Sequence, residues 1–174
     1  NAHYSCVGFS RKIIKKLINF KKPLKHRLKD QNIFLPTINK PSAYDQLIQK
    51  LGGIDIFLLA SGSSDGHVAF NNSKTSIIKK THIIKLSDKT RRDNMKTFPK
   101  FKSLSNVPKY GITVGLGTIL QLTKLAIIVL SGKEKRLAAQ NIIYRKTFSS
   151  KWPSTIIHKC KKKLIYVDQS ALFK

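Results

Sequence analysis

The sequence predicts an α/β fold in which helices flank a mainly parallel β-sheet. Two runs, "IDIFLLA" from Ile54 and "LAIIVLSG" from Leu125, are continuously apolar, as strands inside a parallel sheet usually are. Stretches with a helical spacing of apolar residues alternate with such runs, and the connections are short. The chain has 174 residues, enough for one domain with a substantial core, so we expect a single α/β domain over residues 1–174.

In the first half of the chain, two predicted helices are each followed by a predicted strand. The first helix covers residues 9–20, where isoleucines and leucines recur at helical spacing and lysines occupy the other face. A short strand, "NIFL", follows and stops at Pro36. Ser42 and Asp45 give a capping-box-like start to the second helix, and a glycine pair ends it before "IDIFLLA".

The second half continues the alternation. "THIIKL" is predicted to be a strand, and "SDKTRRDNMKTF" a polar helix that Ser87 or Asp88 can cap. "GITVGLGTIL" is expected to contain a strand, a turn and the start of a helix. The last three elements are a strand, a helix and a strand, in "LAIIVLSG", "KEKRLAAQNII" and "KKLIYVD".

The charge is strongly positive, with 34 lysines and arginines against 8 aspartates and glutamates. A field of this sign attracts nucleic acid and anionic lipid. Specific nucleic-acid recognition is disfavoured, because the lysines are scattered and the sequence has no arginine-rich run, zinc-finger spacing or basic region with heptads. We therefore expect a general basic surface with at most non-specific nucleic-acid binding, and a nucleic-acid-binding module stays open as an alternative.

Other classes of protein are disfavoured by the cysteines and by one long apolar stretch. Cys6 and Cys160 form neither a disulfide framework nor a metal-ligand spacing, so we expect ordinary cytosolic thiols and no metal. The stretch from Tyr110 to Gly132 is long enough to span a bilayer, but Gln121 and Lys124 lie near its middle, where a charge is costly. We expect no membrane partner.

One short segment carries the chemistry. "SGSSDGHVAFNN" follows directly on the strand "IDIFLLA", and ligands of parallel sheets bind at the carboxyl ends of strands. Its small residues would let backbone N–H groups reach an anionic or sugar ligand. Asp65 and His67 stand two residues apart, and histidine exchanges protons near neutral pH. A turn aspartate and a packed or solvated histidine remain the alternatives at this point.

The order of several motifs resembles that of the glucosamine-6-phosphate deaminase (isomerase) family. The matching pieces are "DIFLLASGSSDGHVAFN", "TRRDN", "VPKYGITVGLGTIL", "LAIIVLSGKEKRLAAQ" and "LIYVDQSALF", which are colinear between Ile54 and Phe173. The sister 6-phosphogluconolactonases share Asp-Gly-His, but "AFN" favours the deaminases. The resemblance implies a Rossmann-like sheet and a cytoplasmic enzyme that converts glucosamine 6-phosphate to fructose 6-phosphate and ammonia without a cofactor. Family members differ in oligomeric state, so a homo-oligomer is also open.

The resemblance also implies roles for single residues. It makes His67 the acid and base that opens the sugar ring, and Asp65 a member of its proton relay. Lys135 matches a phosphate-contacting lysine. Lys96 occupies a position where the family usually has a phosphate-binding arginine, so the charge is kept and the bidentate fork is lost.

The ligand-facing loop departs from the family pattern at three positions. Asn72 replaces a glutamate that completes the relay, and an amide cannot ionise. Apart from these departures, Gly62 is expected to contact the substrate, and so is Ser63. Ser61 and Ser63 stand where the family has glycines, so their side chains are expected to crowd the sugar.

A larger departure concerns the amino-terminal side. The family's phosphate loop and the aspartate that acts at C2 have no counterpart, so the first βα units are expected to be missing and the C2 base to lie upstream of Asn1. The chain does not begin with Met, which suggests truncation or processing. The sequence therefore predicts a deaminase of glucosamine 6-phosphate. The alternatives are a catalytically impaired homologue that binds sugar phosphate, a 6-phosphogluconolactonase-like protein and, less favoured, the nucleic-acid-binding module.

Overall fold

The computed structural model describes residues 2–172, which form two compact units. The first unit comprises the chain up to Leu35 together with Asn94–Val107, and the second comprises Pro36–Asp93 and the chain from Pro108 onward. Helix α4 (Asp88–Thr97) begins in the second unit, and its last residues belong to the first. Each unit is described by itself below, and the expectation of a single domain stays a prediction.

The first unit is helical and confirms the helix predicted at residues 9–20. Three consecutive segments form it: α1 (Cys6–Phe9), the π-helical η1 (Ser10–Ile14) and α2 (Lys15–Asn19). The Ser5 hydroxyl caps its start by accepting a hydrogen bond from the Gly8 N–H at 3.1 Å. Short 3₁₀ turns follow at η2 (Leu24–His26), η3 (Asp30–Asn32) and η4 (Leu104–Asn106).

The strand predicted at "NIFL" is wrong. The chain leaves η3 at Asn32 and residues 33–37 have no regular structure. Four apolar residues ended by a proline match a strand by composition, but a strand needs a neighbour to which its backbone can donate and from which it can accept hydrogen bonds. Within residues 2–172, this segment pairs with no other strand.

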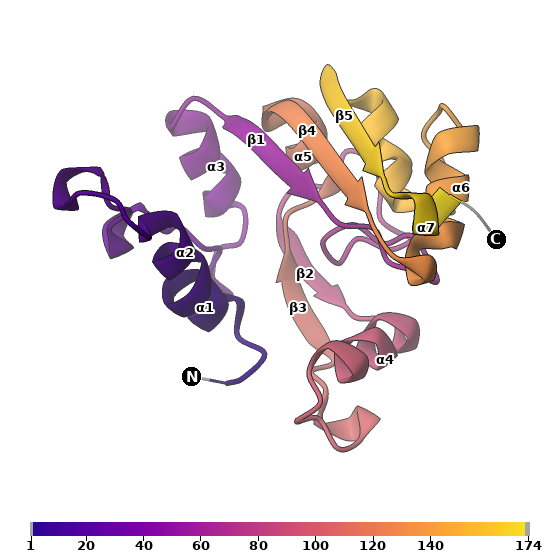
Figure 1. Cartoon of the computed structure of the whole chain (residues 1–174), viewed down its shortest axis with the longest axis horizontal. Helices are drawn as coiled ribbons and strands as arrows, with labels where there is room; N and C mark the ends of the chain where they lie inside the picture. The colour runs from indigo at the N-terminus through magenta and orange to yellow at the C-terminus, as the bar shows by residue number, and fades with distance from the viewer. Residues whose placement is uncertain (1, 173–174) are drawn as a thin grey trace. The chain divides into compact units, whose positions relative to one another are not determined.

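The second unit is built on a parallel three-stranded sheet, which confirms the α/β prediction. Its strands are β1 (Ile54–Leu59), β4 (Thr123–Leu130) and β5 (Lys162–Val167), in the order β1-β4-β5. The register pairs Leu59 with Ile128 and Ile128 with Ile165. Figure 1 shows the three arrows pointing the same way, so their carboxyl ends meet at one edge.

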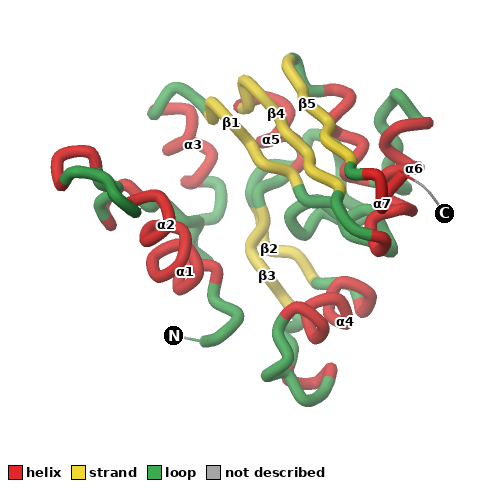
Figure 2. Tube along the Cα trace, viewed as in Figure 1, coloured by secondary structure: helices red, strands yellow, loops and turns green. Residues whose placement is uncertain are grey.

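The other two predicted strands form a separate antiparallel ribbon. β2 (His82–Lys85) pairs with β3 (Tyr110–Thr113), as Figure 2 shows. In this register His82 lies opposite Thr113. The apolar runs identified both strands but not their sheet, because alternation within a run does not report its partner. The stretch considered as a membrane span forms β3, α5 and β4, and no helix in residues 2–172 is long and apolar enough to cross a membrane.

One face of the parallel sheet forms the core. Leu59, Ala126, Ile128 and Leu130 lie on it and are at most 5% exposed. They belong to one buried cluster with residues of α5 (Leu116–Leu122), α6 (Arg136–Tyr144), the 3₁₀ helix η6 (Pro153–Lys159) and α7 (Gln169–Leu172). Helix α3 (Ala43–Lys50) precedes β1, and the 3₁₀ turn η5 (Lys133–Lys135) precedes α6.

The opposite face of the sheet is apolar and exposed. Ile56 and Leu58 of β1 are 56% and 73% exposed, and the alternation of side chains puts both on the face away from Leu59. Val129, Leu164 and Tyr166 continue this face across β4 and β5. Parallel sheets are normally covered on both faces, whereas the described residues leave this face open. The expectation that the first βα units of the fold are missing stays a prediction.

Asp45 has a different role from the one its position suggested. The Ser42 side chain makes no cap hydrogen bond, so the predicted capping box does not form. Asp45 is instead 3% exposed and accepts hydrogen bonds from the Thr81 N–H, at 3.1 Å, and from the Thr118 hydroxyl. This carboxylate therefore joins α3, the segment before β2, and α5.

We expect Asp45→Ala to lower the free energy of unfolding by about 3 kcal/mol, because it leaves the Thr81 N–H and the Thr118 hydroxyl buried without an acceptor. Urea unfolding followed by circular dichroism measures the change. The control is Asp55→Ala, whose carboxylate is exposed and pairs with Lys124 on the surface; it should cost no more than about 1 kcal/mol. Equal effects of the two substitutions would contradict the assigned role of Asp45.

Candidate functional site

The segment after β1 folds back on itself and brings Asp65 next to His67. The Gly62 N–H donates to the His67 carbonyl at 2.7 Å, and the Gly66 N–H donates to the Gly62 carbonyl at 3.2 Å. Gly66 has a φ of +64°, a conformation that costs glycine little, and the Trp152 ring lies where a side chain at this position would project. The loop is thus closed by its own backbone at the carboxyl end of β1.

The Asp65 carboxylate and the His67 imidazole form a hydrogen-bonded pair. His67 Nδ1 lies 2.7 Å from Asp65 Oδ1, and the His67 backbone N–H donates to the same oxygen at 3.2 Å. Both side chains are about five-sixths buried, at 16% and 17% exposure. Because the carboxylate accepts from Nδ1–H, Nε2 is the nitrogen left for proton exchange with a ligand.

The environment keeps Asp65 ionised. Burial by itself would raise its pKa, but the hydrogen bonds from His67, the charge of His67 and the charge of Lys89 together outweigh burial and lower the pKa. The ionised carboxylate orients the imidazole through the Nδ1 hydrogen bond, so the pair has the geometry of an acid and base held in one orientation.

Gly62 supports this pair. A Cβ built on Gly62 would overlap both the His67 imidazole and the Asp65 carboxylate. The absence of a side chain at Gly62 therefore leaves room for both side chains of the pair. Its contact with substrate stays a prediction.

The three residues that depart from the family pattern, Ser61, Ser63 and Asn72, differ in burial and in hydrogen-bond partners. The Ser61 hydroxyl is buried and bonds to the Ser154 hydroxyl at 2.8 Å, so the expectation that Ser61 crowds a ligand is wrong. Ser63 is half-buried, and its contact with substrate stays a prediction. Asn72 holds its own turn, since its side-chain oxygen accepts from the Lys74 N–H at 3.0 Å and its N–H donates to the Thr75 hydroxyl.

A cavity of about 670 Å³ is lined in part by Asp65 and Asn72. His67 contacts it through its hydrogen bond to Asp65 and is not itself among the lining residues. This volume is within the range of sites that bind small molecules, roughly 300–1,000 Å³. The remaining lining residues are Ser64, Ser73, Lys74, Lys85, Leu86, Ser87, Asp88, Lys89, Lys151 and Trp152.

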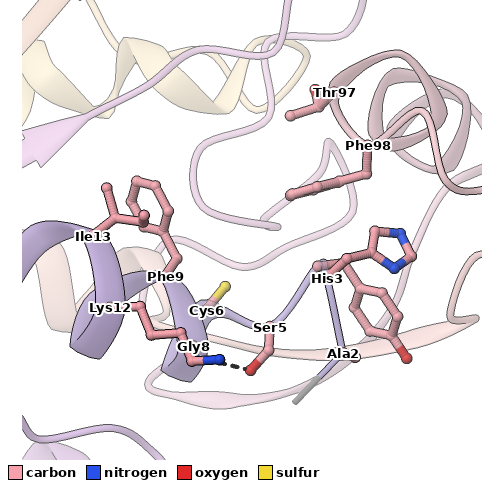
Figure 3. Close-up of a pocket in the computed structure, with 11 residues that line it drawn as sticks. Ala2, His3, Ser5, Cys6, Gly8, Phe9, Lys12, Ile13, Thr97 and Phe98 are labelled. Carbon is pink, nitrogen blue, oxygen red and sulfur yellow. Dashed lines mark hydrogen bonds between the residues drawn. The ribbon is translucent and has the colours of Figure 1, made fainter.

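A second cavity lies within the first unit and has a different character. It measures about 440 Å³ and is lined mostly by apolar atoms, with Phe9, Ile13 and Phe98 among its residues (Figure 3). No carboxylate is among the residues that line it. The cavity beside Asp65 and His67 is therefore the candidate site.

The two lysines expected to bind phosphate are placed differently. Lys135, at the end of η5, donates from Nζ to the Ser61 carbonyl at 2.7 Å, which brings it to the carboxyl end of β1. Lys96 is exposed on the last turn of α4, in the part that belongs to the first unit. Its role in phosphate binding stays a prediction.

The chain is similar in sequence and in fold to known proteins. A glucosamine-6-phosphate deaminase of Halalkalibacterium halodurans is 35% identical over 153 residues, which cover 84% of this chain and 60% of that protein. One of Bacillus velezensis is 37% identical over 128 residues, covering 74% and 51%. A solved structure of a monomeric glucosamine-6-phosphate deaminase, described as a missing link of the NagB superfamily, superposes with a TM-score of 0.75 at 30% identity, covering 89% and 64%.

The chain belongs to the glucosamine-6-phosphate deaminase superfamily. It spans about half to three fifths of the length of the two curated relatives, 51% and 60%. No protein-family profile matches it. A 6-phosphogluconolactonase from Trypanosoma cruzi shares the fold, with a TM-score of 0.52 at 20% identity.

Sequence reasoning missed several residues of this deaminase homologue that surround the pair. The Ser87 hydroxyl caps α4 by accepting from the Thr90 N–H, as predicted, and also lies 3.5 Å from Asp65 Oδ2. The Thr90 hydroxyl lies 3.5 Å from His67 Nδ1. Nothing in their local sequence connects these residues to the loop, because the contacts join residues more than twenty positions apart.

No group of three or more histidines, cysteines, aspartates or glutamates in residues 2–172 is arranged to hold a metal ion. Cys6 is exposed and Cys160 is buried, and both are free thiols.

Asp168 was also missed, although it directly follows β5. It accepts hydrogen bonds from the hydroxyls of Ser131 (2.5 Å) and Ser170 (2.9 Å) and from the backbone N–H groups of Gly132 and Ala171. These hydrogen bonds lower the pKa of Asp168 to about 2. The carboxylate fixes Gly132, at a φ of +93°, just before the turn that carries Lys135. The rule that polar residues at carboxyl ends of strands build sites could have found it.

We expect Gly62→Ala to separate the Asp65–His67 pair, because the new methyl group occupies the space of both side chains. The low-field proton resonance of the His67 Nδ1–H should then be lost from the NMR spectrum. Gly8→Ala is the control, since a Cβ at Gly8 meets only Ser5, at an ordinary distance of 3.6 Å. An unchanged resonance in Gly62→Ala would mean that the pair does not depend on this glycine.

We expect Asp168→Asn to lower the melting temperature at pH 7, and this difference to shrink as the pH falls through about 2. Because the folded-state pKa of about 2 lies below the unfolded value of about 3.9, the carboxylate stabilises the fold above pH 4, and this contribution is lost as the pH falls toward 2. Thermal unfolding of both proteins across this pH range measures the gap. A gap that stays constant with pH would show that the charge of Asp168 has no part in it.

Proposed function

We propose that the protein acts on glucosamine 6-phosphate and converts it to fructose 6-phosphate and ammonia. The observation that carries this proposal is the Asp65–His67 pair beside a cavity at the carboxyl end of β1, in a chain that belongs to this superfamily. The reaction of the relatives is only proposed for this chain, because the chain spans about half of the relative's length.

The proposed chemistry begins with ring opening. The anomeric hydroxyl loses a proton, the bond from C1 to the ring oxygen breaks, and that oxygen gains a proton. His67 suits this exchange because its Nε2 is unoccupied by Asp65, while Asp65 holds the ring and stabilises its charged form. No cofactor is required, since the step moves only protons.

The later steps need a second base. A proton moves from C2 to C1 of the open amino sugar, and water then replaces nitrogen at C2, so that ammonia and the ketose are released. We assign no residue of this chain to the C2 transfer. The proposal makes Lys135 a contact of the phosphate and Asn72 a polar residue that can orient its neighbours but not titrate.

A second candidate is a sugar-phosphate-binding homologue without turnover. It is favoured by Asn72, whose amide oxygen is committed to the Lys74 N–H, and by the unassigned C2 base. Non-specific nucleic-acid binding driven by the net charge of +26 is a weaker third. A cytoplasmic location and self-association stay predictions that accompany the deaminase proposal.

We expect ammonia release from glucosamine 6-phosphate, measured by a coupled assay, and a fall of about 10²–10⁴-fold in kcat in His67→Ala. The control is His26→Ala, which changes an exposed histidine of the first unit. Binding of glucosamine 6-phosphate without ammonia release, together with a gain of turnover in Asn72→Glu, would support the second candidate. Neither binding nor release at any substrate concentration would overturn both.

A further inference from the structure

The cavity within the first unit is walled by two segments that lie far apart in the sequence. Phe9 and Ile13 come from the helical stretch of α1 and η1, and Thr97 and Phe98 come from the end of α4 and the residue after it. Figure 3 shows these two pairs on opposite sides of the space, with the Cys6 sulfur directed into it. All of these residues belong to the first unit, so the cavity is a feature of that unit alone.

Packed aromatic rings hold one wall of this cavity. The Phe101 ring is 6% exposed and packs edge-on against the His3 ring, with the two centroids 4.7 Å apart. The centroids of Tyr4 and Phe98 lie 5.0 and 6.3 Å from that of Phe101, which are usual distances for favourable aromatic pairs. His3, Tyr4 and Phe98 all line the cavity, so one buried ring supports three lining rings from behind.

The cavity has the size and the lining of a site for a small apolar ligand. Its volume of about 440 Å³ is within the range of small-molecule sites, roughly 300–1,000 Å³. Phe9 and Ile13 are 56% and 48% exposed, so a ligand that covers them removes apolar surface from water. These walls do not suit a sugar phosphate, because they cannot provide hydrogen bonds for its many hydroxyl groups.

The charges of the first unit favour an anion in this cavity. Lys12 lines it, and the lysines that form ion pairs within residues 2–172 are Lys15 and Lys124. The two sequence segments of this unit contain one acidic residue, Asp30, whose carboxylate pairs with Lys15 at 2.8 Å. The unit therefore offers Lys12 no second carboxylate, and the Lys12 ammonium can bind an acidic group of a ligand.

We propose that this cavity binds a small aromatic acid, with its ring between Phe9, Ile13 and Phe98 and its carboxylate at Lys12. The ring can stack on Phe9 or Phe98 in the offset or edge-on geometry that aromatic pairs prefer. The inference does not rest on the proposed function, because this cavity shares no lining residue with the cavity of the candidate site.

Phenylpropanoate is the probe, and the thiol of Cys6 reports its binding. Cys6 is exposed and lines the cavity, whereas Cys160 is buried, so iodoacetamide should alkylate Cys6 selectively in the full chain. Mass spectrometry of the Cys6 peptide measures the alkylation rate at increasing concentrations of probe. We expect the rate to fall to a plateau as the cavity fills. Phenylpropanol, which has the same shape without the charge, should protect Cys6 more weakly, and phenylpropylamine should protect it least.

Two matched pairs of variants separate the cavity from the rest of the helical stretch. Phe9→Ala should raise the Kd for phenylpropanoate about tenfold, because the ring loses an apolar wall. Phe20→Ala changes an exposed phenylalanine outside the cavity and should alter the Kd by no more than about twofold. Lys12→Gln should raise the Kd about fivefold, whereas Lys16→Gln removes the same charge from outside the cavity and should not.

The outcomes that contradict the proposal are distinct. No protection of Cys6 at any concentration of phenylpropanoate, or equal weakening by Phe9→Ala and Phe20→Ala, would overturn the site. Equal protection by phenylpropylamine would overturn the assignment to an acid, and equal protection by propanoate would overturn the assignment to an aromatic ligand. None of these measurements depends on ammonia release, so this inference and the proposed function can fail separately.

Discussion

The parallel alignment of β1, β4 and β5 is the constraint on which the candidate site depends. Because the three strands run in one direction, the segments that follow them leave the sheet at the same edge. Lys135, after β4, can therefore reach the Ser61 carbonyl after β1, and Asp168, after β5, can hold Gly132 after β4. These cross-links join three loops that are far apart in the sequence, and the Asp65–His67 pair is part of the first of them.

Three of the few carboxylates of the chain accept several hydrogen bonds within the second unit. Of the 8 acidic residues, Asp45, Asp65 and Asp168 each accept more than one hydrogen bond and tie separate elements together. Many lysines, by contrast, are exposed along the chain, so net charge alone identifies no site. Four lysines line the cavity next to Asp65, whose carboxylate is paired with His67.

The two faces of the parallel sheet differ in burial. The core side of the sheet is complete, with Ile128 and Leu130 fully buried. The other side exposes large apolar residues of all three strands, including Leu58 and Tyr166. The proposed ring opening uses His67, whereas no residue of this chain is assigned to the proton transfer at C2.

The sequence by itself determined the α/β class, the strands β1, β4 and β5, and the loop that carries Asp65 and His67, because apolar periodicity and motif order are properties of neighbouring residues. Tertiary structure alone decided that β2 pairs with β3, that "NIFL" is not a strand, and that Asp45 is a buried cross-link instead of a cap. It also decided that the Ser61 hydroxyl faces Ser154 and that four distant lysines share one cavity. These features depend on contacts between residues far apart in the chain, and no local pattern encodes such a contact.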